Sequence, residues 1–527
     1  MRENRETPLL PVPSAGRKEN AMSGKSFMNG GGESNCGIVP AKQPNKSEKS
    51  PAEVVEERPL AKENTQESNS YRTPSRGSEP NGLARVREAA RKDKKQKFTA
   101  LLHHVNIDLL RDSYRGLKKQ AAAGVDEMTW QEYGEDLEAR LTDLHGRIHR
   151  GAYHAKPSRR VWIPKPDGRQ RPLGVAALED KIVQRAVGTV LNQIWEEDFL
   201  GFSYGFRPAR SQHDALDALW VGIVSKKVNW ILDLDIRSFF DKLQHDWLIK
   251  FVEYRVGDKR VVRLIQKWLK AGVLEEGQWF ETEEGSPQGS VISPILANLY
   301  LHYVLDVWVE AWRRKQAKGD VIIVRYADDA VLGFERKEEA EQFLEQWRER
   351  LAKFGLELHP DKTRLIEFGR YAAERRKRRG DGKPETFNFL GFTHYCGVTH
   401  ATGRFTVHRK TIGKRMAAKL KDIKAKLRQR MHAGLTGTVE WLQQVVRGYF
   451  QFHAIPGNTS RLYTFRREVQ RLWLRTLRRR SQRSRLTWEK FRDSLASLLP
   501  PVRVLHPYPN VRFEAKHPHI RGKNRVR

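Results

Sequence analysis

The clearest pattern of apolar and polar positions in the chain lies at residues 321–334, which read VIIVRYADDAVLGF. Two apolar runs flank the polar pair Asp328 and Asp329. β-Branched apolar runs of this length are typical of buried strands, so the pattern predicts a hairpin with both aspartates at its tip. The alternative is an ordinary polar turn, because Asp is a common turn residue.

A second segment of the same kind lies upstream, at residues 228–240 (VNWILDLDIRSFF). Its apolar strand ends in Asp233 and Asp235, which would share one face of a strand. If this strand neighbours the hairpin, three or four carboxylates converge at one end of a sheet. Such a cluster needs a cationic partner, which can be Arg, Lys or Mg²⁺. It suits a two-metal phosphoryl transfer, in which the ions lie about 3.5–4 Å apart.

A helical period of apolar residues marks several further segments. Residues 293–312 predict a helix with Ser293 as its N-cap and Pro294 as its first residue, and Asp246 is expected to cap another helix. The remaining predicted helices are residues 83–97, 98–117, 130–148 and 179–195, and three with basic outer faces, 412–431, 441–452 and 462–477.

Composition points to a nucleic-acid partner. The 527 residues carry a formal net charge of +33, and so large a basic excess indicates a polyanion. The two cysteines, Cys36 and Cys396, exclude a disulfide framework or a four-cysteine zinc site. We expect no membrane span and an intracellular setting.

Seven segments, in a fixed order, resemble the motifs of the reverse transcriptases encoded by group II introns, which also act as maturases. They are Ile163–Pro172 (IPKPDGRQRP), the strand that contains Asp235, Ser286–Pro294 (SPQGSVISP), Tyr326–Asp329 (YADD), His359–Arg364 (HPDKTR), Phe389–Phe392 (FLGF) and Gly448–Asn458 (GYFQFHAIPGN). The resemblance runs from about residue 98 to about residue 518. It implies an α+β right-hand polymerase, with antiparallel sheet in its fingers and palm, followed by an α-helical thumb and maturase domain.

On this resemblance the chain divides into five parts. They are a disordered N-terminal extension (1–82), an N-terminal basic helix with the fingers (83–225), a palm with the catalytic aspartates and the primer grip (226–400), a helical thumb and maturase domain (401–490) and a basic C-terminal tail (491–527). Some relatives end in a zinc-bearing endonuclease domain. Because no cysteine lies near His506, His517 and His519 in the sequence, we do not expect that domain here.

The resemblance also assigns the metal site. It implies that Asp235 and Asp328 bind two Mg²⁺ ions and that Asp329 contributes more weakly. Asp233 is not expected to be a ligand, because the family match places the ligand at the start of DIRSFF. Lys362 is implied to protonate the leaving pyrophosphate, and the alternative is a surface lysine.

Four residues are implied to contact the incoming nucleotide. Lys165 and Arg171, around the turn of the first motif, would hold the triphosphate, and Gln288 would line the nucleotide pocket, with the glycines of GSPQG close to a base pair. Phe240 would pack under the sugar and exclude a 2′-hydroxyl. The alternative for Phe240 is core packing, with Phe239 facing the other way.

Two further groups of residues are expected to contact nucleic acid. The hairpin that grips the primer end is implied at Phe389, Leu390, Gly391 and Phe392. Intron RNA would be bound by Arg447, Arg461, Arg466 and Arg467, with the aromatics of 448–458 either stacking on RNA or forming a helix–helix core. Arg207 and Arg210 are predicted to be phosphate contacts or surface charges, and residues 375–379 an exposed basic loop.

The function implied is that of an RNA-directed DNA polymerase encoded by a group II intron. It would copy intron RNA into DNA during retrohoming and, as a maturase, promote splicing. Its partners would be group II intron RNA, target DNA and dNTPs, without a membrane, in the cytoplasm near the nucleoid. The alternatives are a retron-like or CRISPR-associated reverse transcriptase, or a non-catalytic RNA-binding splicing factor.

Overall fold

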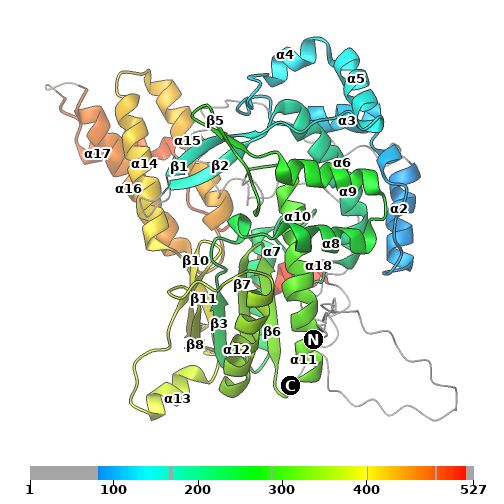
Figure 1. The fold of residues 1–527 in the computed structure, drawn as a ribbon. Helices are drawn as coiled ribbons and strands as arrows, with labels where there is room; N and C mark the ends of the chain where they lie inside the picture. Colours follow the sequence, from blue (N-terminus) through cyan, green and yellow to red (C-terminus); the bar gives the residue numbers. More distant parts are fainter. Residues whose placement is uncertain (1–80, 165–169, 286–288, 400, 481–483, 518–527) are drawn as a thin grey trace.

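The computed structural model describes residues 81–164, 170–285, 289–399, 401–480 and 484–517. This part of the chain is an α+β structure with antiparallel and mixed sheets and a helical C-terminal region (Figure 1). Lys165, Gln288, His519 and nearly all of the predicted N-terminal extension lie outside it. None of the described helices is long and apolar enough to cross a membrane.

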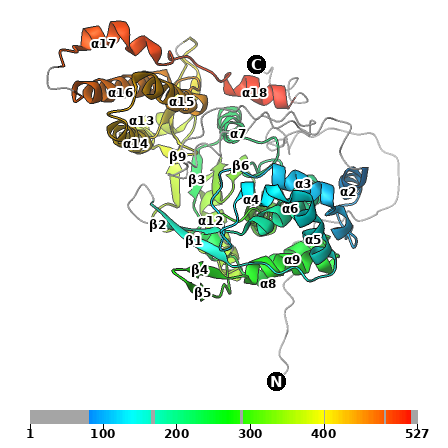
Figure 2. The ribbon, with the colours of Figure 1, turned by 90° about the horizontal axis from the view of Figure 1, so that it is seen from above.

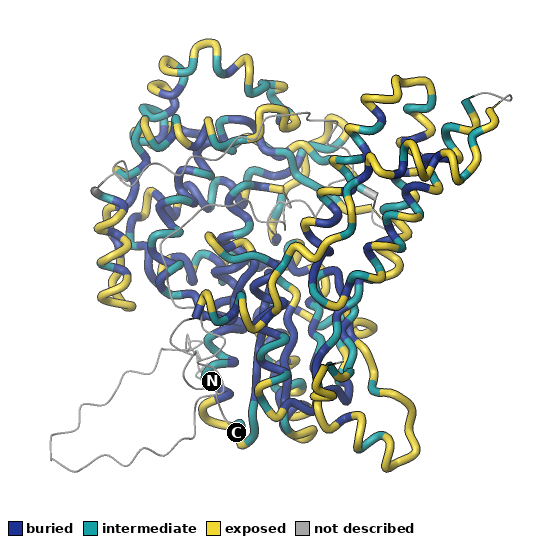
Figure 3. The backbone as a smooth tube through the Cα atoms, turned by 180° about the vertical axis from the view of Figure 1, so that it is seen from behind, coloured by how far each residue is buried: buried dark blue, intermediate teal, exposed yellow. Residues whose placement is uncertain are grey.

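The central sheet has four antiparallel strands in the order β6-β7-β3-β8. The strands and the two helices that cover them are β3 (Trp230–Leu234), β6 (Val321–Tyr326), β7 (Asp329–Phe334), β8 (Arg364–Glu367), α7 (Gln212–Ser225) and α12 (Lys337–Lys353). Ile322 packs against Gly222 of α7, whereas Phe334 on the other face contacts Phe343 of α12. Burial on both faces explains why β6 and β7 carry continuous apolar runs instead of alternating apolar and polar residues (Figure 3).

A second, mixed sheet has the order β2-β1-β4-β5, and β1 and β4 are its parallel pair. Its strands are β1 (Ser158–Pro164), β2 (Gln170–Val175), β4 (Val273–Glu275) and β5 (Gln278–Phe280). The helices of this half are α2 (Asn81–Lys92), α3 (Ile107–Arg115), α4 (Trp130–Glu135), α5 (Leu137–His149), α6 (Leu178–Asp198), α8 (His245–Arg255) and α9 (Lys259–Lys270). The helix predicted at 98–117 begins only at Ile107, where Asn106 accepts the Leu109 N–H. Asp246 lies inside the first turn of α8, so its prediction as a cap is wrong.

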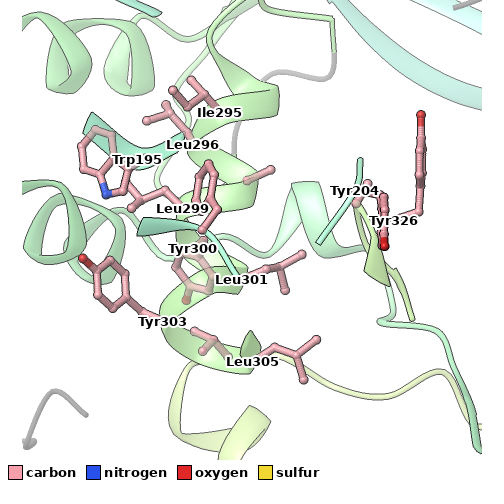
Figure 4. Packing of buried hydrophobic residues seen from close by; sticks show 14 of the residues in the cluster. Trp195, Tyr204, Ile295, Leu296, Leu299, Tyr300, Leu301, Tyr303, Leu305 and Tyr326 are labelled. Atoms are coloured by element: carbon pink, nitrogen blue, oxygen red, sulfur yellow. The ribbon is translucent and has the colours of Figure 1, made fainter. Parts of the chain in front are cut away.

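The helix predicted at 293–312 is interrupted. It consists of α10 (Ser293–Leu301), a π-helical segment η3 (His302–Asp306) and α11 (Val307–Lys315). Ile292, not Ser293, is the N-cap of α10. All five residues of η3 are buried, and Figure 4 shows Tyr303 and Leu305 inside the core. π-Helical segments are rare and occur frequently at functional sites.

The third sheet, β11-β10-β9, is followed by the C-terminal helices. The elements are β9 (Phe387–Phe389), β10 (Phe392–Val398), β11 (Phe405–Thr411), α14 (Gly413–Gln429), α15 (Leu435–His453), α16 (Thr459–Arg478) and α17 (Trp488–Ser494). Helices α14 to α16 confirm the three predicted basic helices. Their apolar stripes form a hydrophobic core of their own, separate from the core around the central sheet. Figure 2 shows these helices gathered to one side of the sheets.

The prediction of an exposed basic loop at 375–379 is wrong, and the basic C-terminal segment contains helices. Most of residues 375–379 belongs to helix α13 (Ala372–Arg378), where Arg375 and Arg379 pair with the buried Glu367 of β8. After α17 the chain returns to the sheets, and α18 (Pro509–Lys516) packs along α7 (Figures 1 and 2). The described part of the predicted basic tail therefore ends in a docked helix.

Buried carboxylates of α7 explain why this segment is ordered. Asp217 pairs with Arg512 of α18 at 2.5 Å and with Arg409 of β11 at 3.1 Å, and Lys516 pairs with Asp214 at 2.6 Å. A buried carboxylate is costly unless it is paired, so the docked helix supplies cations that α7 needs.

Candidate active site

The tip of the β6–β7 hairpin presents the predicted aspartates. Tyr326 pairs with Asp329 across the hairpin, and Ala327 and Asp328 form the turn. The backbone φ of Ala327 is 55°. This left-handed conformation costs about 1–2 kcal/mol for a residue other than glycine. The predicted hairpin is confirmed, and its turn is held in a conformation that the sequence alone disfavours.

Asp235 reaches the same end of the sheet. Leu234 of β3 pairs with Ala330 of β7, so continuing the antiparallel register by one step places Asp235 beside Asp329. The Oδ2 atom of Asp235 lies 2.8 Å from Nζ of the exposed Lys362. The predicted convergence of this strand with the hairpin is confirmed.

Two of the carboxylates at this end have raised pKa values. Desolvation of its carboxylate, with added repulsion from Asp328 and Asp235, raises the pKa of Asp329 to about 8, although the residue as a whole is exposed. Burial raises the pKa of Asp233 to about 7, although Arg364 opposes that shift. A cation bound between these groups would restore their charged forms.

The donor set suits a divalent metal. Mg²⁺ prefers carboxylate oxygens and usually completes its coordination with water and substrate phosphates. Within the described residues, no three His, Cys, Asp or Glu side chains are grouped closely enough to hold an ion unaided. The raised pKa of Asp329 and the ammonium group of Lys362 beside Asp235 both indicate a demand for positive charge. These residues therefore fit a metal site that the substrate completes.

A glycine that motif reasoning missed lets a neighbouring loop close on the hairpin tip. A Cβ atom on Gly205 would lie 2.2 Å from the backbone nitrogen of Ala327. In Figure 4 the neighbouring Tyr204 lies next to Tyr326. The sequence signal that could have indicated this contact is the glycine within SYGFRP, because glycine allows two backbone segments to approach this closely.

Both predicted interpretations of the loop arginines are wrong. Arg207 is buried and pairs with Glu196 at 3.0 Å. Arg210 donates to the backbone carbonyls of Gly201 and Ser203 at 2.7 and 2.8 Å, and burial lowers its pKa to about 9. Both guanidinium groups are used inside the protein, where they hold the loop in place.

Phe239 and Phe240 differ in exposure. Phe239 is buried, whereas Phe240 is half-buried. They lie in a 3₁₀ turn, η2 (Phe239–Asp241), instead of an extended strand, and their rings meet edge-to-face with centroids 5.3 Å apart. A Cβ atom on Gly285 would lie 3.0 Å from the Phe240 carbonyl oxygen. Phe240 is thus the more exposed of the two residues, as a sugar-contacting residue requires.

The structure describes only some of the residues that are predicted to contact the incoming nucleotide. Arg171 is exposed on β2, opposite Ile163 of β1. Lys165 and Gln288 lie outside the described residues, so their roles remain predictions. Gly289 lies against β2, where an added Cβ atom would be 2.9 Å from the Gly174 carbonyl oxygen. The close approaches of Gly285 and Gly289 are therefore to the protein's own backbone.

The segment predicted to grip the primer is a tight hairpin between β9 and β10. Both loop residues have positive φ, 43° at Leu390 and 85° at Gly391, which is the pattern of a type I′ turn. Phe389 and Phe392 are buried on either side, and Phe392 stacks on Phe452 of α15 with centroids 5.5 Å apart. The loop is anchored to the C-terminal helices, and its role at the primer remains a prediction.

The four C-terminal arginines are placed differently. Arg447 on α15 and Arg467 on α16 are exposed, and Arg461 is half-buried. Arg466 donates to three backbone carbonyls within residues 496–500, at 2.8 to 3.1 Å. N–H groups of its guanidinium are therefore used in hydrogen bonds within the protein.

The aromatic residues of the last motif support the helix–helix core alternative. Tyr449, Phe450 and Phe452 are all buried. Tyr449 stacks on Phe465 of α16 with ring centroids 3.6 Å apart. These rings hold α15 against its neighbours, which leaves the exposed cations of this region as its candidate RNA contacts.

Known proteins are similar to the part of the chain that contains this site. The family model described as Reverse transcriptase (RNA-dependent DNA polymerase) matches residues 163–394. Protein YkfC of Escherichia coli (strain K12) is 34% identical over 295 residues, which are 49% of this chain and 77% of YkfC.

Two intron proteins are similar over a smaller part of their own length. The group II intron-encoded protein LtrA of Lactococcus lactis subsp. cremoris is 33% identical over 225 residues, 42% of this chain and 37% of LtrA. An uncharacterized 91 kDa protein in the cob intron of Schizosaccharomyces pombe is 41% identical over 158 residues, 30% of this chain and 19% of that protein. With its aspartates gathered at one sheet end, the chain belongs to the reverse transcriptases, as an RNA-dependent DNA polymerase related to the proteins that group II introns encode.

Proposed function

We propose that this chain is a right-hand polymerase encoded by a group II intron, which copies intron RNA into DNA during retrohoming and acts as a maturase in splicing. The central sheet is its palm, the mixed sheet with the helices around it forms the fingers, and α14 to α16 form the thumb and maturase domain. The observation that carries the proposal is the meeting of Asp235 with Asp328 and Asp329 at one sheet end. The relationship to LtrA supports the intron setting.

In the proposed reaction, Asp235 and Asp328 hold two Mg²⁺ ions, and Asp329 contributes more weakly. When bound, the ions supply charge stabilisation for the attacking 3′-hydroxyl and the leaving pyrophosphate. Lys362 is exposed beside Asp235, where it can give a proton to the leaving pyrophosphate. Phe240 packs under the sugar of the incoming dNTP and excludes a 2′-hydroxyl. The triphosphate and base are contacted by Lys165, Arg171 and Gln288.

Nucleic acid is held by surfaces outside the metal site. The Phe389–Phe392 hairpin supports the primer end, and the exposed arginines Arg447 and Arg467, with Arg461, bind the backbone of the intron RNA. The net charge of +33 supports a polyanionic partner, since phosphate contacts supply most sequence-independent affinity. Target DNA binds through the same basic surface.

The test is the Asp328→Ala variant. We expect it to abolish primer extension on an RNA template, a loss of orders of magnitude, because it removes the ligand of the charge-stabilising metals. RNA binding should be unchanged. Asp361→Ala, at the exposed neighbour of Lys362, is the matched control and should extend normally. Near-normal extension by Asp328→Ala would overturn the proposal.

A further inference from the structure

Arg325 is a fully buried arginine within the apolar strand β6. Its side chain has no exposure to solvent, and the carboxylate that faces it, Asp306, is equally buried. Burying an arginine is costly unless its charge is paired and its donors are used. The position lies three residues before Asp328, directly behind the hairpin tip.

All five N–H groups of Arg325 are used. Nε and Nη2 donate to the two carboxylate oxygens of Asp306, at 2.7 and 2.6 Å. Nη2 also donates to Ser203 Oγ at 2.7 Å, and Nη1 donates to Asn298 Oδ1 at 3.1 Å and to the Ala327 carbonyl at 3.0 Å. A guanidinium group has five donors in a fixed plane, whereas a lysine has three. Lysine therefore cannot replace this set of contacts.

The bond to the Ala327 carbonyl reaches the catalytic turn itself. Ala327 has a left-handed backbone, and its carbonyl belongs to the peptide that leads into Asp328. A backbone in this conformation persists only where its surroundings hold it. Arg325 is the group that holds it from behind, because Nη1 fixes the direction of this peptide.

The remaining partners anchor the guanidinium group to two other elements. Asp306 is the last residue of the π-helical segment η3. Asn298 lies on α10, which runs directly into η3 as part of the same interrupted helix. Asn298 also donates to the Gly205 carbonyl at 2.7 Å, in the loop that closes on the tip. The interrupted helix and the loop that contains Ser203 and Gly205 are thus both connected to the hairpin through the guanidinium group of Arg325.

We propose that Arg325 is a positioning residue of the polymerase: clamped by Asp306, its guanidinium group fixes the Ala327–Asp328 peptide and keeps Asp328 and Asp329 in register with Asp235. This inference rests on the proposed role of Asp328 at the metal site. It explains why a buried arginine is built into β6 and paired with a buried carboxylate from η3. It also gives the π-helical segment a function, which is to present Asp306 to the hairpin.

The experiment compares Arg325→Lys with Arg255→Lys in the full chain. Arg255, at the end of α8, is also fully buried, but its bonds go to Asp198 at 2.5 Å and to three backbone carbonyls within residues 93–96, not to the hairpin turn. Both variants should lose thermal stability. For Arg325→Lys alone, we expect kcat for single-nucleotide addition to fall about 100-fold and the half-saturating Mg²⁺ concentration to rise about 10-fold or more. RNA affinity should stay unchanged.

A milder variant keeps the inference testable if Arg325→Lys does not fold. Ser203→Ala removes one hydrogen bond without leaving a buried charge unpaired, and it should raise the half-saturating Mg²⁺ concentration by a smaller factor. Unchanged Mg²⁺ dependence in the folded Arg325 or Ser203 variants, or an equal change in Arg255→Lys, would overturn the positioning role. If Asp328→Ala extends primers normally, the proposed function itself fails, whatever Arg325 does.

Discussion

The aspartate end of the central sheet and the C-terminal helices use charge in opposite ways. At the sheet end, strand register forces like charges together, and desolvation with their repulsion raises the pKa of Asp329 to about 8. On α15 and α16, cations such as Arg447 and Arg467 are spread over exposed helix faces, while Arg466 is used internally. The charge proposed for catalysis therefore depends on single positions, whereas the charge proposed for RNA binding is distributed over several residues and can be removed one residue at a time.

The strongest test of this contrast separates polymerisation from splicing. A double Asp328→Ala, Asp329→Ala variant should lose primer extension by orders of magnitude, because two of the proposed metal ligands are gone. It should still promote intron splicing at a near-normal rate, since carboxylates without metal contribute nothing attractive to RNA. The measurement is both activities at matched ionic strength.

The reciprocal variant reverses the exposed charges. Arg447→Glu with Arg467→Glu should weaken splicing while sparing extension on a short, unstructured template. If each variant loses both activities in proportion, the two surfaces are not separable, and the C-terminal helices act solely as a polymerase thumb.

A smaller effect is expected at Phe240, which is proposed to exclude the 2′-hydroxyl of a ribonucleotide. Phe240→Ala should admit ribonucleotides while keeping much of the dNTP activity, because a missing ring removes the steric block to a 2′-hydroxyl. We expect discrimination between dNTP and rNTP to fall by about 10–200-fold, the range for steric selection in a pocket. The readout is kcat/KM for each nucleotide.

Phe239→Leu provides the comparison for that experiment. Phe239 is buried, so this change should lower thermal stability and leave discrimination intact. Unaltered rNTP exclusion in Phe240→Ala would instead identify Phe240 as a packing residue.

The smallest effects divide the neighbours Arg466 and Arg467. Arg466→Ala leaves three carbonyls without their donor and should lower the free energy of unfolding by about 1–3 kcal/mol. Arg467→Ala should leave stability unchanged and reduce the slope of log affinity against log salt by about 1, because one phosphate contact is lost. Thermal unfolding and RNA titrations across a salt series measure both. Equal affinity losses without a stability difference would show that Arg466 also faces RNA.

The sequence by itself determined the elements that carry the chemistry. The apolar runs around Asp328 and before Asp235 predicted strands that end in carboxylates, and the structure has them at one sheet end. The apolar stripes of α14 to α16 were equally readable. Such signals are local, because a period of two or of 3.6 residues shows in a short window of sequence.

Tertiary structure alone decided which charges are structural. Arg207 and Arg466 look like surface or RNA-facing cations in sequence, yet each donates to groups from other segments. The sequence likewise gives no partner for Arg325, which pairs with Asp306 of η3. The docking of α18 through Asp217 likewise joins positions far apart in the chain. A buried arginine is stable only where a carboxylate or carbonyls from distant segments surround it. Because those partners meet only after the chain has folded, no local sequence pattern predicts which arginines they will surround.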